Sequence, residues 1–248
     1  MELGLVSISF REFTVEQIMQ AVKNAGLTCV EWGSDVHAPC NDAEKLAEIV
    51  KLQQQYGLQC SSYGTYFRLG CDDIAQLPDY IRAAKVLGTN ILRLWCGKKD
   101  PDSILPEEKE KLFADCKTAA AMAENENIIL CLECHNNTYT QTKEGALELM
   151  QHVGSPAFRM YWQPNQFRTF EENIEYIRLM KDYTTHIHVF QWKGKDRFPL
   201  SDGIEEWQGY LTAFNGDHTL LLEFMPDDRI EMLPREAEAM KQIVGGFV

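Results

Sequence analysis

The stretch LCLECHNN, residues 130–137, joins an apolar run to polar side chains at the point where a buried strand would end. Glu133 and His135 stand at that end, and Cys131 and Cys134 bracket the glutamate. Three interpretations compete for this stretch: a redox or zinc CxxC motif, a satisfied polar pair in the core, or a catalytic metal site. The remaining sequence has to separate them.

Similar apolar runs, rich in β-branched and aromatic residues, recur along the whole chain. The eight runs occupy residues 3–8, 28–32, 58–63, 90–95, 128–133, 158–163, 186–191 and 220–225. Helical periodicity fills the segments between them, most clearly at residues 14–26, 42–57, 74–88 and 106–127. Eight strand–helix alternations predict a parallel sheet that closes into one (β/α)8 TIM barrel over residues 1–248.

Local signals agree with this α/β fold and disfavour the main alternative. Thr14 and Asp42 are expected N-caps, and Gly26, Gly57 and Gly88 stand just past the ends of predicted helices. A doubly wound open sheet would usually carry a glycine-rich turn after its first strand, but the segment SISFREF that follows here is not one. We also find no linker and no second domain.

Composition restricts the class of partner. The net charge is −13, which repels a phosphate backbone, so we expect no nucleic-acid partner. No apolar run approaches the roughly 18 residues of a membrane span, and no leader peptide precedes the first predicted strand. We therefore expect a cytoplasmic protein whose eight cysteines are reduced thiols. A homodimer is left open.

Polar residues collect at the carboxyl ends of the predicted strands, where a TIM barrel builds its active site. Four of the six histidines fall there. One histidine at a strand end is usually structural, but four beside two carboxylates favour a functional site. The candidate residues are Glu31, His37, Arg93, Glu133, His135, Gln163, Gln166, His186, His188, Lys193 and Glu223.

Strand parity argues against the CxxC interpretation. Side chains alternate across a strand, so Cys131, Glu133 and His135 share one face while Cys134 points to the other. Glu223 is expected at the same height in the eighth strand. Buried carboxylates are rarely tolerated unless they are paired or bound to a cation, so two that face each other favour a metal site.

With these motifs in place, the sequence resembles the xylose-isomerase-like sugar isomerase/epimerase barrels over nearly its whole length. The resemblance is carried by VEWGSDVHAP (30–39), CLECHNN (131–137), HIHVF (186–190) and LLEF (221–224). It implies a divalent cation, with Mn, Mg, Co and Zn as candidates, bound by Glu133, His188 and Glu223. It also implies a sugar-like small-molecule substrate, contacted by His37 and, where its strand turns it inward, by Glu31.

The sixth strand departs from the family pattern. The segment YWQPNQ places Gln163 where the family has a metal-binding Asp, and Gln166 where it has a His. A glutamine oxygen can bind a hard cation but brings no charge, so we expect weaker metal binding.

The chemistry implied is proton transfer next to a carbonyl. Glu133 and Glu223 would take and return a proton on a sugar, keto-sugar or polyol-derived substrate through an enediolate, giving an isomer or an epimer. The predicted substrate-binding residues are His37, Glu31, His135, His186, Gln166, Lys193 and Arg93. Arg93 has a second interpretation, because a buried guanidinium needs an anion and Glu31 on a nearby strand can supply it.

Other roles stay open at this stage. Trp32, Trp95, Trp162 and Trp192 either pack at the rim or stack on a sugar. Lys193, Lys195 and Arg197 form either a solvated loop or a receptor for a substrate anion. Two functional alternatives remain: a barrel that binds a sugar or sugar acid without turnover, and a metal phosphodiesterase resembling endonuclease IV.

Overall fold

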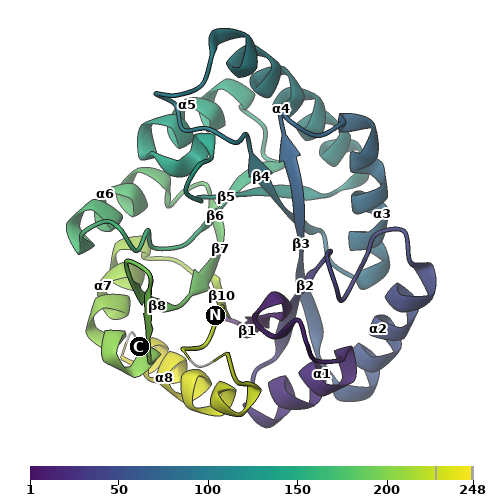
Figure 1. Ribbon diagram of the computed structural model, residues 1–248, viewed down its shortest axis with the longest axis vertical. Helices are drawn as coiled ribbons and strands as arrows, with labels where there is room; N and C mark the ends of the chain where they lie inside the picture. The colour runs from purple at the N-terminus through teal and green to yellow at the C-terminus, as the bar shows by residue number, and fades with distance from the viewer. Residues whose placement is uncertain (227, 247–248) are drawn as a thin grey trace.

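Eight parallel strands close into a barrel in the computed structural model, which describes residues 1–226 and 228–246. Around the barrel the strands follow the order β1, β10, β7, β6, β5, β4, β3, β2 (Figure 1). Their bounds are β1 Leu3–Val6, β2 Cys29–Gly33, β3 Gln59–Leu69, β4 Ile91–Cys96, β5 Ile129–Glu133, β6 Phe158–Trp162, β7 Thr184–Val189 and β10 Thr219–Leu222. The predicted (β/α)8 barrel is confirmed.

The helices form a ring outside the barrel (Figure 1). They are α1 Val15–Asn24, α2 Ala43–Tyr56, α3 Leu77–Leu87, α4 Pro106–Glu126, α5 Lys143–Val153, α6 Phe170–Met180, α7 Ile204–Phe214 and α8 Leu233–Gly245. The predicted N-caps are confirmed, because the Thr14 and Asp42 side chains accept from backbone N–H groups in the first turns of α1 and α2. Among the described helices, none is long and apolar enough to cross a membrane.

Short 3-10 turns complete the connections between strands and helices. They are η1 Ser7–Phe10, η2 Ile74–Gln76, η3 Tyr139–Gln141, η4 Leu200–Gly203 and η5 Ile230–Met232. The turn η1 directly follows β1, so it lies at the carboxyl end of the barrel, where the functional site is expected.

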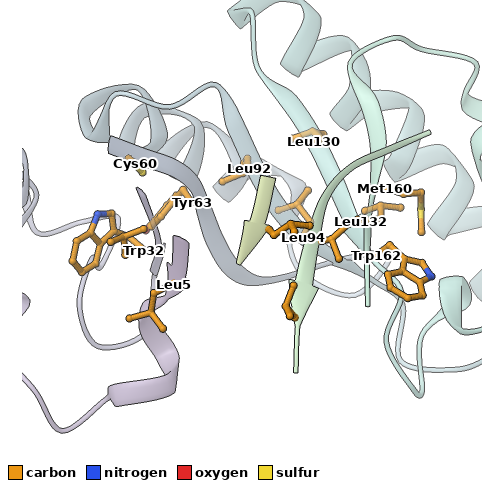
Figure 2. Packing of buried hydrophobic residues seen from close by; sticks show 14 of the residues in the cluster. Leu5, Trp32, Cys60, Tyr63, Leu92, Leu94, Leu130, Leu132, Met160 and Trp162 are labelled. Carbon is orange, nitrogen blue, oxygen red and sulfur yellow. The ribbon is translucent and has the colours of Figure 1, made fainter. Parts of the chain in front are cut away.

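The main core lies between the outer face of the strands and the helices. Outward-facing residues such as Leu5, Leu92, Leu130 and Met160 are buried there (Figure 2). Trp32 and Trp162 belong to the same core. The structure therefore decides between the two roles left open for these tryptophans in favour of packing.

The inside of the barrel is apolar towards the amino ends of the strands and polar towards their carboxyl ends. Cys29, Ile91, Cys131 and Leu221 form an apolar cluster with neighbours on β1 and β6. Two positions after each of these four residues, the same segment carries a charged residue. Residues two positions apart in a strand point to the same side, so the charged residues also face the inside of the barrel. All eight cysteines carry free thiols, as expected.

One element was not predicted. The apolar run expected at 186–191 ends as a barrel strand at Val189, and residues 191–198 form an antiparallel hairpin of β8 Gln191–Lys193 and β9 Asp196–Phe198. Arg197 of this hairpin pairs with Asp228 and stacks on Trp192, with 4.8 Å from its guanidinium to the ring centroid. The structure thus replaces the expected loop with a hairpin held by a cation–aromatic contact.

Candidate active site

A cavity of about 220 Å³ opens at the carboxyl ends of the strands. Its wall brings together six of the predicted site residues, together with aromatic residues that follow β7 and β10. These six are Arg93, Glu133, His135, Gln163, Gln166 and Glu223. Because they come from β4, β5 and the segments after β5, β6 and β10, only the closed barrel makes them neighbours.

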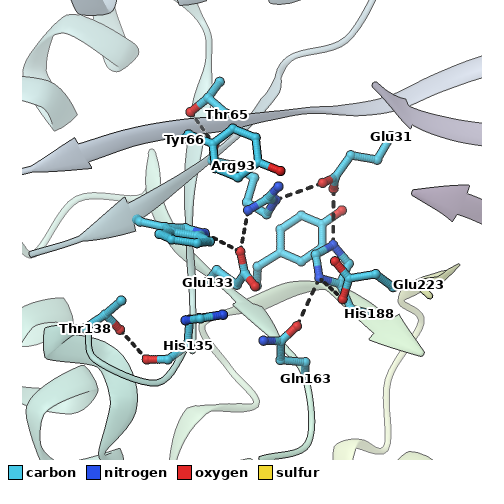
Figure 3. A network of polar contacts seen from close by, with 12 residues as sticks. Glu31, Thr65, Tyr66, Arg93, Glu133, His135, Thr138, Gln163, His188 and Glu223 are labelled. Atoms are coloured by element: carbon cyan, nitrogen blue, oxygen red, sulfur yellow. Dashed lines mark hydrogen bonds and ion pairs between the residues drawn. The ribbon is translucent and has the colours of Figure 1, made fainter. Parts of the chain in front are cut away.

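Arg93 on β4 is the cation at the centre of one side of the site. Its side chain is 2% exposed; Nε donates to Glu31 Oε1 at 2.8 Å, and Nη1 donates to a Glu133 carboxylate oxygen (Figure 3). The prediction that Glu31 partners Arg93 is confirmed, and Glu133 is a second partner. Burial alone would raise the pKa of Glu31, but the charges of Arg93 and His188 and the hydrogen bonds to the carboxylate together outweigh burial and lower it.

The close approach of Arg93 and Glu31 depends on Gly64 of β3. A Cβ at that position would lie 2.4 Å from Glu31 Oε1 and 2.8 Å from Arg93 Nη2. Any side chain there would therefore displace the ion pair, so this strand position requires the smallest residue.

Trp95 fixes Glu133 from a second direction. Its indole Nε1–H donates to the same carboxylate oxygen that binds Arg93. The ring is packed by Arg68, whose guanidinium lies 3.8 Å from the ring centroid, and by His135, which stacks at 4.6 Å with an angle of 19° between the planes. Side chains of the protein itself thus pack against the Trp95 ring, which disfavours the interpretation of Trp95 as a surface on which a sugar stacks.

His188 on β7 centres the other side of the site and is fully buried. Its Nε2 lies 3.4 Å from Glu31 Oε2, and its Nδ1 lies 3.2 Å from Gln163 Oε1 and 3.6 Å from Glu223 Oε2 (Figure 3). Burial lowers the pKa of His188, but Glu223 and Glu31 outweigh that effect, so the pKa is raised overall. Glu31 therefore orients the ring so that Nδ1 faces Gln163 and Glu223.

Two buried hydroxyl groups support Glu31, and neither was predicted from the sequence. Ser62 Oγ donates to Glu31 Oε2 at 2.9 Å and lies 3.0 Å from the hydroxyl of Tyr161. The Tyr161 ring lies 4.6 Å from the His188 ring. Strand parity could have identified Tyr161, because residues 161 and 163 share one face of an extended strand.

Two distances from His188 Nδ1 are compatible with a cation among three of the four predicted ligands, His188, Gln163 and Glu223. Donor atoms bound to one cation at about 2.1 Å lie about 3.0–3.4 Å apart, close to the two distances from His188 Nδ1 to Gln163 and Glu223. Glu133 differs, because Arg93 and Trp95 already bind its carboxylate. Across residues 1–226 and 228–246, no group of three or more His, Cys, Asp or Glu side chains is placed to hold a metal.

The backbone is strained immediately after Glu223. Burial raises the pKa of its carboxyl. The next residue, Phe224, adopts φ 52°, a conformation that is unusual for a bulky side chain. The Phe224 N–H donates to Ser9 Oγ at 2.9 Å, so the loop after β1 fixes the turn that follows Glu223. Such strain is often stored at functional sites.

Two predicted substrate-binding histidines lie away from the cavity. His37 is buried, and its two ring nitrogens contact Ser7 Oγ at 3.2 Å and the Phe13 carbonyl at 3.1 Å, so the chain itself satisfies this ring. His186 lies one inward-facing position below His188, with Nε2 3.3 Å from the Ser61 carbonyl. The structure gives no support to substrate contact by either histidine.

Three further predicted residues lie near the cavity without lining it, and Arg11, which does line it, was not predicted. Lys193 lines a second, outer cavity, and Glu31 and His188 are fully buried beneath the first one. On the inner wall, Arg11 donates to Asp35 Oδ2 at 2.7 Å and to the Tyr66 hydroxyl. Arg11 lies in the connection between η1 and α1, where sequence periodicity does not predict which way a side chain points.

CxxC chemistry is not supported by the placement of the two cysteines. Cys131 is part of the inner apolar cluster, whereas Cys134 packs against the outer core and donates its thiol to the Gln163 carbonyl. Burial raises the pKa of each thiol to about 12. Both are therefore protonated structural thiols at neutral pH.

Comparison with known proteins agrees with the geometry. The family model described as xylose isomerase-like TIM barrel matches residues 19–243, and no curated protein matches the sequence. The crystal structure of the probable 3-DHS dehydratase AsbF, involved in petrobactin synthesis, from Bacillus anthracis, superimposes with a TM-score of 0.83 at 17% identity, covering 97% of this chain and 99% of that one.

Two other solved structures are similar over the full barrel. IOLI protein with a binding zinc atom gives a TM-score of 0.80 at 14% identity, covering 100% of this chain and 99% of that chain. A D-psicose 3-epimerase from Clostridium cellulolyticum H10, solved with D-tagatose, gives 0.74 at 15% identity and 99% coverage of each chain. Identities this low show the shared fold. The match to the family model spans most of the sequence, and the chain therefore belongs to the xylose isomerase-like TIM barrel family.

Proposed function

We propose that this barrel is an isomerase or epimerase that moves a proton at the carbon next to the carbonyl of a sugar, keto-sugar or polyol-derived substrate. One observation carries the proposal: Glu133 and Glu223, from β5 and the end of β10, line the same small cavity. Two carboxylates on either side of a bound substrate can take and return a proton. The structurally similar D-psicose 3-epimerase is, by its name, an enzyme of this class.

The chain's own residues orient the reacting groups. Arg93 and Trp95 hold the Glu133 carboxylate in one orientation, which keeps it aimed at a substrate in the cavity. His135, packed on Trp95, and Gln166 present polar atoms on the same wall and are assigned to hydroxyl groups of the substrate. Glu31 acts from beneath as a positioning residue for His188 and Arg93.

A divalent cation belongs to the proposal. His188, Gln163 and Glu223 would hold it, and when bound it would polarise the substrate carbonyl as a Lewis acid. The solved IOLI structure, which shares this fold, contains a zinc atom, and this supports a metal in the present barrel. We expect modest affinity, because Gln163 contributes no charge and Arg93 already neutralises Glu133.

The experiment follows solvent proton exchange. The purified protein, with Mn²⁺ added, is incubated in D₂O with a panel of ketoses that includes D-psicose, D-tagatose and D-fructose. Loss of the C–H signal next to the carbonyl is followed by proton NMR. We expect exchange with at least one ketose, and we expect Glu133→Gln to reduce its rate by about 10²-fold or more. Glu144→Gln, on the exposed start of α5, is the matched control. Exchange that is unchanged in Glu133→Gln would refute the assignment.

A non-catalytic sugar-binding barrel is the second candidate. The observation that favours it is the engagement of Glu133 by Arg93, which occupies one of the two carboxylates. In that case the sugar that binds most tightly would show no exchange at any Mn²⁺ concentration. Binding of a small sugar-like ligand without exchange would select this function over catalysis.

A further inference from the structure

We infer that a second binding subsite adjoins the reaction cavity and accepts an uncharged sugar ring, so that the substrate is a glycoside or disaccharide rather than a single free sugar. The inference rests on the proposed function, because it extends the substrate outward from the carbons that react. The subsite is the outer cavity, of about 760 Å³, formed by the segment after β6, the β8–β9 hairpin and the start of α7.

The two cavities share a wall. Pro164, Asn165, Gln166, Phe190 and Trp192 line both of them. The inner cavity alone, at about 220 Å³, is smaller than the roughly 300–1,000 Å³ typical of ligand pockets. The two cavities are therefore adjacent, and we place the second ring of a ligand that extends beyond the inner cavity in the outer one.

Aromatic side chains form one side of the outer cavity. Phe167 is 62% exposed and Phe170 is 36% exposed, high values for large apolar residues. Phe170 is held in place by α7. Its ring stacks on Tyr210 with 5.1 Å between the ring centroids, and it packs so closely on Gly209 that a Cβ there would lie 2.6 Å from the ring. Exposed aromatic surface at a cavity marks a binding face, and the C–H face of a sugar ring packs well against it.

Hydrogen-bond acceptors line the same cavity, next to the aromatic residues. Glu206 accepts from the Tyr210 hydroxyl at 2.6 Å and from Gln191 Nε2 at 3.2 Å, so its carboxylate is held in place. Glu205 stands beside it in the first turn of α7. Fixed carboxylates beside an aromatic face suit a ring that carries hydroxyl donors.

The charge of the cavity favours a neutral ligand. Glu205 and Glu206 are balanced by Arg168 and Lys193 on the same wall. A phosphate or carboxylate on the outer ring would meet the two acids as well as the two bases, whereas an uncharged ring avoids that repulsion.

Trp192 provides an independent indication at the junction. Its indole lines both cavities, and its Nε1–H is buried without a hydrogen-bond partner in the part of the chain that the structure describes. Buried donors are almost always paired in folded proteins. The unpaired donor belongs to a side chain that lines both cavities, but its nitrogen is covered, so an oxygen that bridges the two rings of a ligand would pair with it only after the indole turns.

The test is equilibrium binding, measured by isothermal calorimetry with defined probes. D-Glucose is compared with maltose, cellobiose, lactose and sucrose, using wild type and the double variant Phe167→Ala/Phe170→Ala. We expect at least one disaccharide to bind about tenfold or more tightly than glucose, and the double variant to lose that gain while its glucose affinity is unchanged. Phe198→Ala, which removes an exposed phenylalanine from β9, is the matched control and should keep the gain.

Two results would overturn the inference: no disaccharide binds more tightly than glucose, or the gain survives in the double variant. The comparison is repeated in Glu133→Gln, which removes the proposed base on the inner wall but leaves the outer cavity intact. Preference for a disaccharide in a variant without turnover separates this subsite from the proposed reaction. Turnover of free monosaccharides with no disaccharide preference would keep the reaction and reject the subsite.

Discussion

The charged and polar side chains inside the barrel form two groups that differ in how closely their members are paired with one another. On the side of β2, β4 and β5, Arg93 lies between Glu31 and Glu133 in close ion pairs. On the side of β7 and β10, His188 faces Gln163 and Glu223 at longer distances of 3.2 and 3.6 Å. The first side carries its own cation, whereas the second is arranged around atoms that a proton or metal ion can bridge.

This difference indicates where function can reside in a shared layer. Removing one partner from a closed, buried ion pair mainly costs stability, because the remaining charge is left uncompensated. Groups at longer distances around a buried imidazole are freer to exchange partners with a ligand. We therefore expect loss of Arg93, the cation of the first side, to affect folding, and substitutions on the second side to affect binding and turnover.

Arg93→Met should have the largest effect and should act on stability. It leaves Glu31 and Glu133 buried without a cation, so the free energy of unfolding should fall by about 3–5 kcal/mol. Urea denaturation followed by circular dichroism measures it. Arg82→Met is the control, because Arg82 and Asp79 form an exposed pair whose loss should cost about 0–1 kcal/mol. Equal losses in the two variants would contradict the closed-pair interpretation.

Glu223→Gln should lower turnover rather than stability. It keeps the shape of the side chain but removes one of the two carboxylates proposed to transfer the proton, so the exchange rate should fall by about 10²-fold. The urea midpoint should move little, because the pKa of Glu223 is already raised by burial and the neutral form is tolerated. A variant that unfolds readily, like Arg93→Met, would show that the two sides do not differ.

Gln163→Asp should tighten metal binding on the second side. Adding a carboxylate next to His188 and Glu223 should raise the Mn²⁺ affinity by about tenfold, or about 1.4 kcal/mol, with an equal or lower turnover rate because a more neutralised cation polarises a carbonyl less. Calorimetric titration of metal-free protein measures the affinity. Gln163→Glu controls for the shorter Asp side chain. If neither variant binds Mn²⁺ more tightly than wild type, Gln163 is not a ligand.

Cys131→Ala and Cys134→Ala should have the smallest effect. The two thiols lie on opposite faces of the β5 region and contact apolar neighbours and the Gln163 backbone. Metal content, measured by mass spectrometry of the purified proteins, should stay within about twofold of wild type, and stability should change by about 1 kcal/mol. Loss of metal in both variants would restore the CxxC interpretation.

Local sequence patterns were sufficient to predict the fold and the inward direction of the main charged residues. Every predicted strand overlaps an observed barrel strand, because apolar periodicity and caps are properties of neighbouring residues. Alternation along the fifth strand correctly separated Cys131 and Glu133 from Cys134. Even the pairing of Arg93 with Glu31 followed from the rule that a buried charge needs a partner.

Which polar residues meet depends on the closed barrel. Arg93 and Glu31 are 62 positions apart in sequence, and Tyr161 and Ser62 are 99 apart, so their contacts depend on barrel closure and strand register. The hydrogen bond from Trp95 to Glu133 and the shared wall of the two cavities also depend on barrel closure and strand register. Periodicity reports which way a side chain points along one strand. Its partner is set by the neighbouring strands and loops, and no local pattern encodes them.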